Sequence, residues 1–109
     1  LIDTAEWEGI DPVLAEDMLC EVQQKMLDDF VASVRAQMVG AEKDFHLTRT
    51  PLVLDAEGLQ EALDAHERAR LELIEIATRS AARMVESGEE GIGVTSSQSC
   101  FRMPRPQAR

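Results

Sequence analysis

Two long segments of this chain carry apolar residues at the spacing of an α-helix, and they limit the folds that it can adopt. The first runs from Pro12 to Val39 without an internal Gly or a further Pro. Its apolar residues recur every four positions, at Leu14, Met18, Val22, Met26, Phe30, Val34 and Met38. This period predicts a helix with one broad apolar face. Asp11 suits its beginning as a capping acid, and Gly40 suits its end.

The second segment lies between Asp55, a capping acid, and Gly88, a glycine placed where a helix would end. Its apolar stripe again has the helical period, with one histidine in it. The stripe consists of Leu59, Ala62, Leu63, His66, Ala69, Leu73, Ile76, Ala77, Ala81 and Met84. We therefore expect a second long helix that ends at Ser87.

Two shorter segments are expected to be strands. Residues 45–50 alternate apolar and polar side chains, and Pro51 would place that strand at a sheet edge or bend it. Residues 94–103 follow a glycine-containing turn and are expected to be extended, although residues 95–99 are polar. The order helix, strand, helix, strand predicts a mostly α (α+β) fold. In it, two long antiparallel helices carry a small two-stranded antiparallel sheet.

The chain length and the net charge limit the functions that this chain can have. A chain of 109 residues is one domain by length, and we expect a helical domain over residues 1–101 followed by a flexible, basic, proline-containing tail over 102–109. The net charge of −10 argues against direct binding of nucleic acid or of an anionic membrane. No apolar run approaches the ~20 residues of a membrane span, and no signal peptide is visible.

The cysteines and the first residue suggest the context of the chain. Cys20 and Cys100, without a secretion signal, indicate reduced thiols in a cytoplasm, although a disulfide between them stays open. The chain begins with Leu1 rather than Met. We expect it to be a fragment of a longer protein or a processed form.

The length of the helices predicts a homodimer. A helix of about 28 residues is about 42 Å long, whereas a compact domain of this size has a radius of gyration of about 13 Å. Two such helices cannot enclose each other's wide apolar stripes, so a second copy would cover them in a four-helix arrangement. A further domain of the same protein is the alternative cover. The candidate interface residues are Met18, Val22, Met26, Phe30, Leu73 and Ile76.

No pattern of catalytic residues is present, and we expect no enzyme. The chain has no glycine-rich phosphate loop after a strand and no Gly-x-Ser-x-Gly. His46, His66, Cys20 and Cys100 could each ligate a metal, but no two of them have a diagnostic spacing. We therefore predict no metal and no cofactor.

Four residues are candidates for binding a small-molecule effector. His66 and Arg70 lie on or near the second apolar stripe. A packing histidine with a hydrogen bond, and an arginine paired with an acid, are the commoner structural roles of such residues. Trp7 is the only tryptophan and would either plug one end of the helix pair or stack on a ligand. His46 is the fourth candidate.

The run His-Leu-Thr-Arg-Thr-Pro-Leu-Val-Leu-Asp-Ala-Glu-Gly from His46 to Gly58 precedes a long acidic helix. An acidic turn with Trp7 and a helix from Pro12 that contains Asp28-Asp29 come before it. These features resemble the C-terminal region of actinobacterial ArsR-like winged-helix transcriptional regulators, over most of residues 3–95. After Gly93 the chain departs from that family, in which an apolar strand would follow.

The resemblance implies a dimerisation and effector-sensing domain of a bacterial transcriptional regulator. Such a chain would bind DNA only through a winged-helix domain that precedes this region and is missing from it. The alternative is a stand-alone helical adaptor that binds another protein through its apolar stripe.

Overall fold

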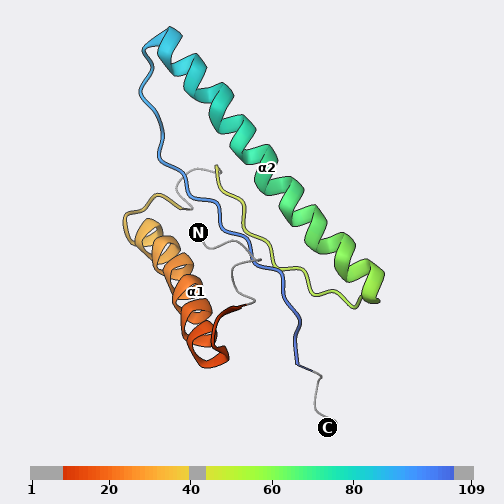
Figure 1. Cartoon of the computed structure of the whole chain (residues 1–109). Helices are drawn as coiled ribbons and strands as arrows, with labels where there is room; N and C mark the ends of the chain where they lie inside the picture. The colour runs from red at the N-terminus through yellow and green to blue at the C-terminus, as the bar shows by residue number, and fades with distance from the viewer. Residues whose placement is uncertain (1–8, 40–43, 105–109) are drawn as a thin grey trace. The chain divides into compact units, whose positions relative to one another are not determined.

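A computed structural model describes residues 9–39 and 44–104 of the chain (Figure 1). Two helices are present in these residues, α1 (Pro12–Arg35) and α2 (Ala56–Ser87). They belong to two different compact units, Leu1–Thr48 and Arg49–Arg109. The predicted mostly helical character is confirmed, and each unit is described by itself below.

Helix α1 begins as the sequence predicts and ends earlier. The Asp11 carboxylate accepts hydrogen bonds from the backbone N–H groups of Val13 (2.9 Å) and Leu14 (3.4 Å), which would otherwise lack partners at the helix start. The helix ends at Arg35, because Gln37 adopts a left-handed φ of 61°. A C-terminal end at Val39 before Gly40 was therefore wrong.

The end of α1 is a Schellman motif with a glutamine in the position that glycine usually occupies. The backbone N–H of Gln37 donates to the carbonyl of Val34 at 3.0 Å, and that of Met38 donates to the carbonyl of Ser33 at 2.9 Å. These bonds satisfy carbonyls that the helix leaves open. The left-handed conformation costs a non-glycine residue about 1–2 kcal/mol, so Gln37 is held there at an energetic disadvantage.

Helix α2 has the predicted ends. Asp55 accepts a hydrogen bond from the backbone N–H of Gly58 at 2.7 Å. At the other end Gly88 has a left-handed φ of 69° and donates to the carbonyl of Met84 at 2.9 Å. Glycine adopts this conformation without a steric cost, which is why the helix stops there. The confirmed limits give α2 a length of 32 residues.

The predicted strands are absent from the described residues, so the α+β fold with a two-stranded sheet is wrong. Residues 44–55 and 89–104 have no regular secondary structure, and in the described ranges no backbone hydrogen bond joins the two segments. Pro51 lacks a ladder donor, and the polar run 95–99 offers no apolar face to bury. Alternating side chains alone do not make a strand without a partner strand.

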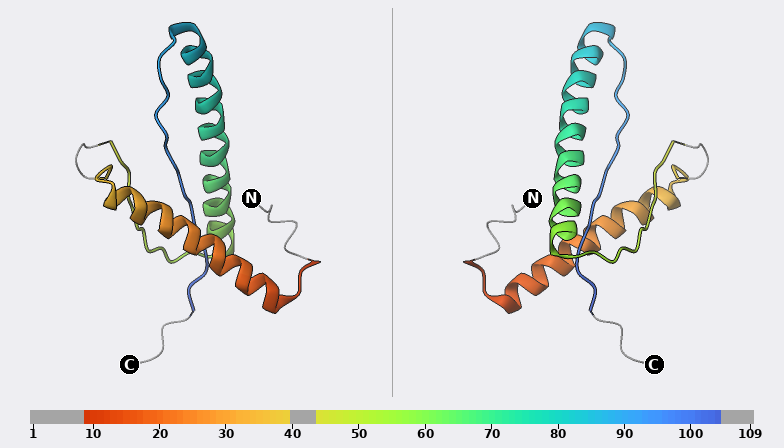
Figure 2. Two further views of the ribbon diagram at one scale, coloured as in Figure 1. Left: turned by 90° about the vertical axis from the view of Figure 1, so that its left-hand side faces the viewer. Right: turned by 90° about the vertical axis from the view of Figure 1, so that its right-hand side faces the viewer.

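Within the described residues each unit contains one helix, so neither unit by itself contains the predicted antiparallel helix pair. Residues 89–104 instead run back along α2, in the opposite direction to the helix (Figures 1 and 2). The predicted tail over 102–109 lies mostly outside the described residues, which end at Pro104.

Candidate functional site

Neither unit has a buried core in its described residues. No described side chain is buried, and large apolar side chains are exposed along both helices. Folding orders each residue at a cost of about 1–2 kcal/mol of backbone entropy, which buried apolar surface normally offsets. The exposed apolar faces of α1 and α2 are therefore the candidate functional surfaces of the described residues.

The apolar face of α1 holds four of the six predicted interface residues. Val22 and Phe30 each expose 38% of their surface, and Met18 and Met26 are half-buried. Spaced by four, they follow one side of the helix. We call this set the α1 stripe: Met18, Val22, Met26 and Phe30.

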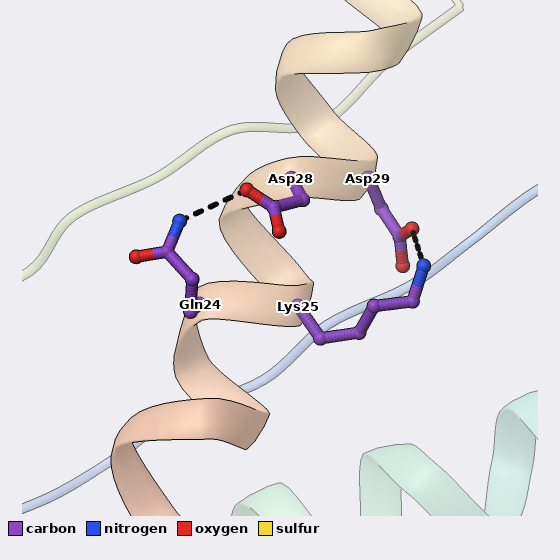
Figure 3. Close-up of polar contacts among 4 residues, drawn as sticks. All are labelled: Gln24, Lys25, Asp28 and Asp29. Carbon is purple, nitrogen blue, oxygen red and sulfur yellow. Dashed lines mark hydrogen bonds and ion pairs between the residues drawn. The ribbon is translucent and has the colours of Figure 1, made fainter.

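Two pairs of polar side chains lie on α1, and the two residues of each pair are one helical turn apart (Figure 3). The Gln24 side-chain amide donates to Asp28 at 2.9 Å, and the Lys25 ammonium donates to Asp29 at 2.7 Å. The hydrogen bond from Lys25 to Asp29, followed by their charge attraction, raises the pKa of Lys25 above its ordinary value. Such exposed pairs add little to the stability of a helix, and here the partners of Gln24 and Lys25 lie on α1 itself.

The apolar face of α2 includes the other two predicted interface residues. Leu73 and Ile76 each expose 42% of their surface, and Leu63 exposes 40%. Leu59 and Met84, near the two ends of the helix, are half-buried. We call this set the α2 stripe: Leu59, Leu63, Leu73, Ile76 and Met84.

His66 lies on the same face as the α2 stripe and contacts a segment that is distant in sequence. Its Nδ1 atom is 2.9 Å from Oε1 of Gln98, a contact that orients the two side chains toward each other. With Ala65 and Ala69 they line a shallow, open hollow of about 210 Å³. The expected hydrogen bond to His66 is present, but the residue lies at the surface and not in a core.

Arg70 forms a bidentate pair with Glu67 of its own helix, an arginine–acid pair of the kind expected for this residue. Its Nε and Nη2 atoms donate to the two carboxylate oxygens at 3.0 and 2.7 Å. The hydrogen bonds from Arg70 lower the pKa of Glu67 below its ordinary value.

The pKa of Glu67 gives a test of this pair. Because the folded-state pKa is lowered, the contribution of the pair to stability is present above the ordinary carboxyl pKa and is lost as the pH falls through the lower value. An NMR titration of the Glu67 carboxyl should therefore give a lower pKa in the wild type than in an Arg70→Gln variant. Equal values in the two proteins would contradict the bidentate geometry.

The two remaining ligand candidates are His46 and Trp7. His46 belongs to the other unit, where its Nε2 atom is 3.2 Å from the hydroxyl of Thr48, two residues away. Trp7 lies outside the described residues. The described part of the chain holds no group of three His, Cys, Asp or Glu side chains that could bind a metal ion. Within it, neither helix combines the length and apolar character needed to cross a membrane.

Sequence reasoning missed Gln98. Its position in a polar run indicated no role, and only the fold brings it to His66. In the structure Gln98 and Cys100 are half-buried, while Ser97 and Ser99 are exposed, which is the two-residue period of an extended chain with one side covered. The residue types of this polar run gave no such signal.

Comparisons with protein-family models, with curated proteins and with solved structures found no match to this chain. These comparisons therefore do not test the resemblance to ArsR-like regulators.

Proposed function

We propose that this chain is a helical association module that binds a second copy of itself through the α1 and α2 stripes, and that it is not an enzyme. The observation that carries the proposal is the lack of any buried apolar side chain in the described residues, together with two long helices that expose apolar stripes. Apolar faces of this length are covered in stable proteins. A second copy supplies matching faces on the same helices.

The narrower form of the proposal gives this association a biological role. The module would be the dimerisation and effector-sensing region of a bacterial transcriptional regulator, with DNA contacted only by a separate winged-helix domain. The sequence from His46 to Gly58 supports this reading through its resemblance to ArsR-like regulators. Both cysteines are free thiols, as is usual in a cytoplasm, where we place the protein.

Sedimentation equilibrium at several salt concentrations tests the association and identifies its partner. Each copy carries a net charge of −10, so two copies repel each other and salt screens that repulsion. We expect the wild type to exceed the mass of one chain, and the Kd of the dimer to fall as salt rises. A mass of one chain at every concentration would contradict the proposal.

The same measurement separates self-association from an adaptor role. An adaptor that bound a different protein through its apolar stripe would have the mass of one chain when it is alone. A chain that is monomeric at every concentration but binds a second protein would favour the adaptor.

A further inference from the structure

The hollow beside His66 brings together side chains from two segments of the unit Arg49–Arg109. Ala65, His66 and Ala69 come from α2, and Gln98 comes from the segment that runs back along it. Ala65 and Ala69 are one helical turn apart and have no side-chain atoms beyond Cβ, so the helix leaves room there. The volume of about 210 Å³ is below the range of about 300–1,000 Å³ that is usual for drug-sized ligands. The hollow therefore suits a smaller molecule.

The contact between His66 and Gln98 decides which hydrogen-bonding atoms are left for a ligand. Oε1 of Gln98 is a carbonyl oxygen and only accepts, so Nδ1 of His66, which is 2.9 Å away, carries the proton and donates. In a neutral imidazole the other ring nitrogen, Nε2, is then an acceptor. Neither this Nε2 atom nor the side-chain NH₂ group of Gln98 makes a hydrogen bond with a described residue. The pair therefore offers an acceptor on His66 and a donor on Gln98.

The charges around the hollow favour an uncharged ligand. None of the four residues that line it is an Asp, Glu, Lys or Arg. Arg70, one turn after His66, is engaged in the bidentate pair with Glu67. A charged ligand would lose part of its hydration without gaining a partner of opposite charge. An anion would also be repelled by the net charge of −10.

We propose that this hollow binds a small, uncharged, planar compound that carries a hydrogen-bond donor beside an acceptor, as in a primary carboxamide or a lactam. The N–H group of the compound donates to Nε2 of His66, and its carbonyl oxygen accepts from the side-chain amide of Gln98. Its flat face lies against the methyl groups of Ala65 and Ala69. The inference names the class of effector for the proposed effector-sensing function, and it rests on that function.

A ligand bound in this way joins two parts of the chain. His66 belongs to α2, whereas Gln98 lies 32 positions later in the segment along it. A compound that bonds to both side chains stabilises the conformation in which that segment lies against the helix. Binding is thereby linked to the conformation of residues 89–104.

The test uses benzamide as the probe and follows the ring signals of His66 by NMR in the full chain. We expect saturable shifts with a Kd of about 1–10 mM, since the site is open and the probe small. The ring of His46, which contacts Thr48 in the other unit, is the internal reference and should not shift. N,N-dimethylbenzamide lacks the donor, and benzoate lacks it and is charged. Each should bind about two- to tenfold more weakly than benzamide.

Ala69→Leu and Ala82→Leu form a matched pair of variants for this titration. Leucine at position 69 fills the hollow, whereas Ala82 is an exposed residue on the other side of α2. Both residue types favour a helix, so neither change should unfold α2, and circular dichroism checks this. Ala69→Leu should weaken benzamide binding at least about tenfold, and Ala82→Leu should leave the Kd within about twofold of the wild type.

The outcomes separate this site from the proposed function. The inference is overturned if benzamide causes no saturable shift of His66, if N,N-dimethylbenzamide binds equally well, or if Ala69→Leu binds like Ala82→Leu. A chain that dimerises without binding benzamide would keep the proposed self-association and lose this site. Binding of benzamide that leaves the Kd of self-association unchanged would support the site and contradict the effector-sensing function.

Discussion

Leu73→Glu should weaken self-association at least about 30-fold. Leu73 is at the centre of the α2 stripe and exposes 42% of its surface in a single chain. Covering it with a second copy would bury the new carboxylate among apolar side chains, at a cost of about 2 kcal/mol or more. The dimer Kd from sedimentation equilibrium measures the effect.

Ala82→Glu is the matched control for this variant. It adds the same charge to the same helix, nine residues later, which at about 100° per residue is the opposite side of α2. That side already carries the charged residues, and both alanine and glutamate favour a helix. The Kd should change less than about threefold. Equal weakening by Leu73→Glu and Ala82→Glu would show that total charge, and not the α2 stripe, governs association.

Met26→Glu asks whether α1 takes part as well. Met26 is half-buried on the α1 stripe, and Ala32→Glu adds the same charge to an exposed position about a third of a turn around the helix from Met26. We expect Met26→Glu to act like Leu73→Glu. If Met26→Glu resembles Ala32→Glu instead, the interface is restricted to α2.

The two left-handed residues at the helix ends predict stability changes of opposite sign. Gly88→Ala places a side chain at φ 69° and should lower the free energy of unfolding of α2 by about 1–2 kcal/mol. Gln37→Gly removes a side chain at φ 61° and should stabilise the end of α1 by up to about 1 kcal/mol. Thermal unfolding followed by circular dichroism measures both.

Gly93→Ala is the control for Gly88→Ala. No atom lies within 4 Å of a side-chain carbon at Gly93, and its backbone does not have a positive φ. Its Tm should match or slightly exceed that of the wild type. A Gly88→Ala protein as stable as Gly93→Ala would contradict the assigned end of α2 and the left-handed turn at Gly88.

The helices were predictable because their signals are local. Asp55 and Gly88 bracket α2 by hydrogen bonds and a backbone conformation that depend on the nearest residues only. The end of α1 was misjudged for the complementary reason. Glycine is the usual residue at such an end, but at Gln37 the backbone bonds to Ser33 and Val34 maintain the left-handed turn without one.

The strands and Gln98 were not predictable from local pattern. Residues 45–50 alternate as a strand would, yet a strand also needs a partner with free donors and acceptors, which no single segment encodes. The second expected strand runs back along α2 instead (Figure 1), with a polar contact between Gln98 and His66. Contacts between residues 32 positions apart depend on the whole path of the chain.

Thermal unfolding at increasing protein concentration tests the central claim most directly, because ligand-like binding of a second copy stabilises the folded chain by mass action. If the apolar stripes are covered by association, the Tm of the wild type should rise by several degrees between dilute and concentrated solutions. A cooperative transition whose Tm is independent of concentration would mean that one chain covers its own stripes, and it would contradict the account.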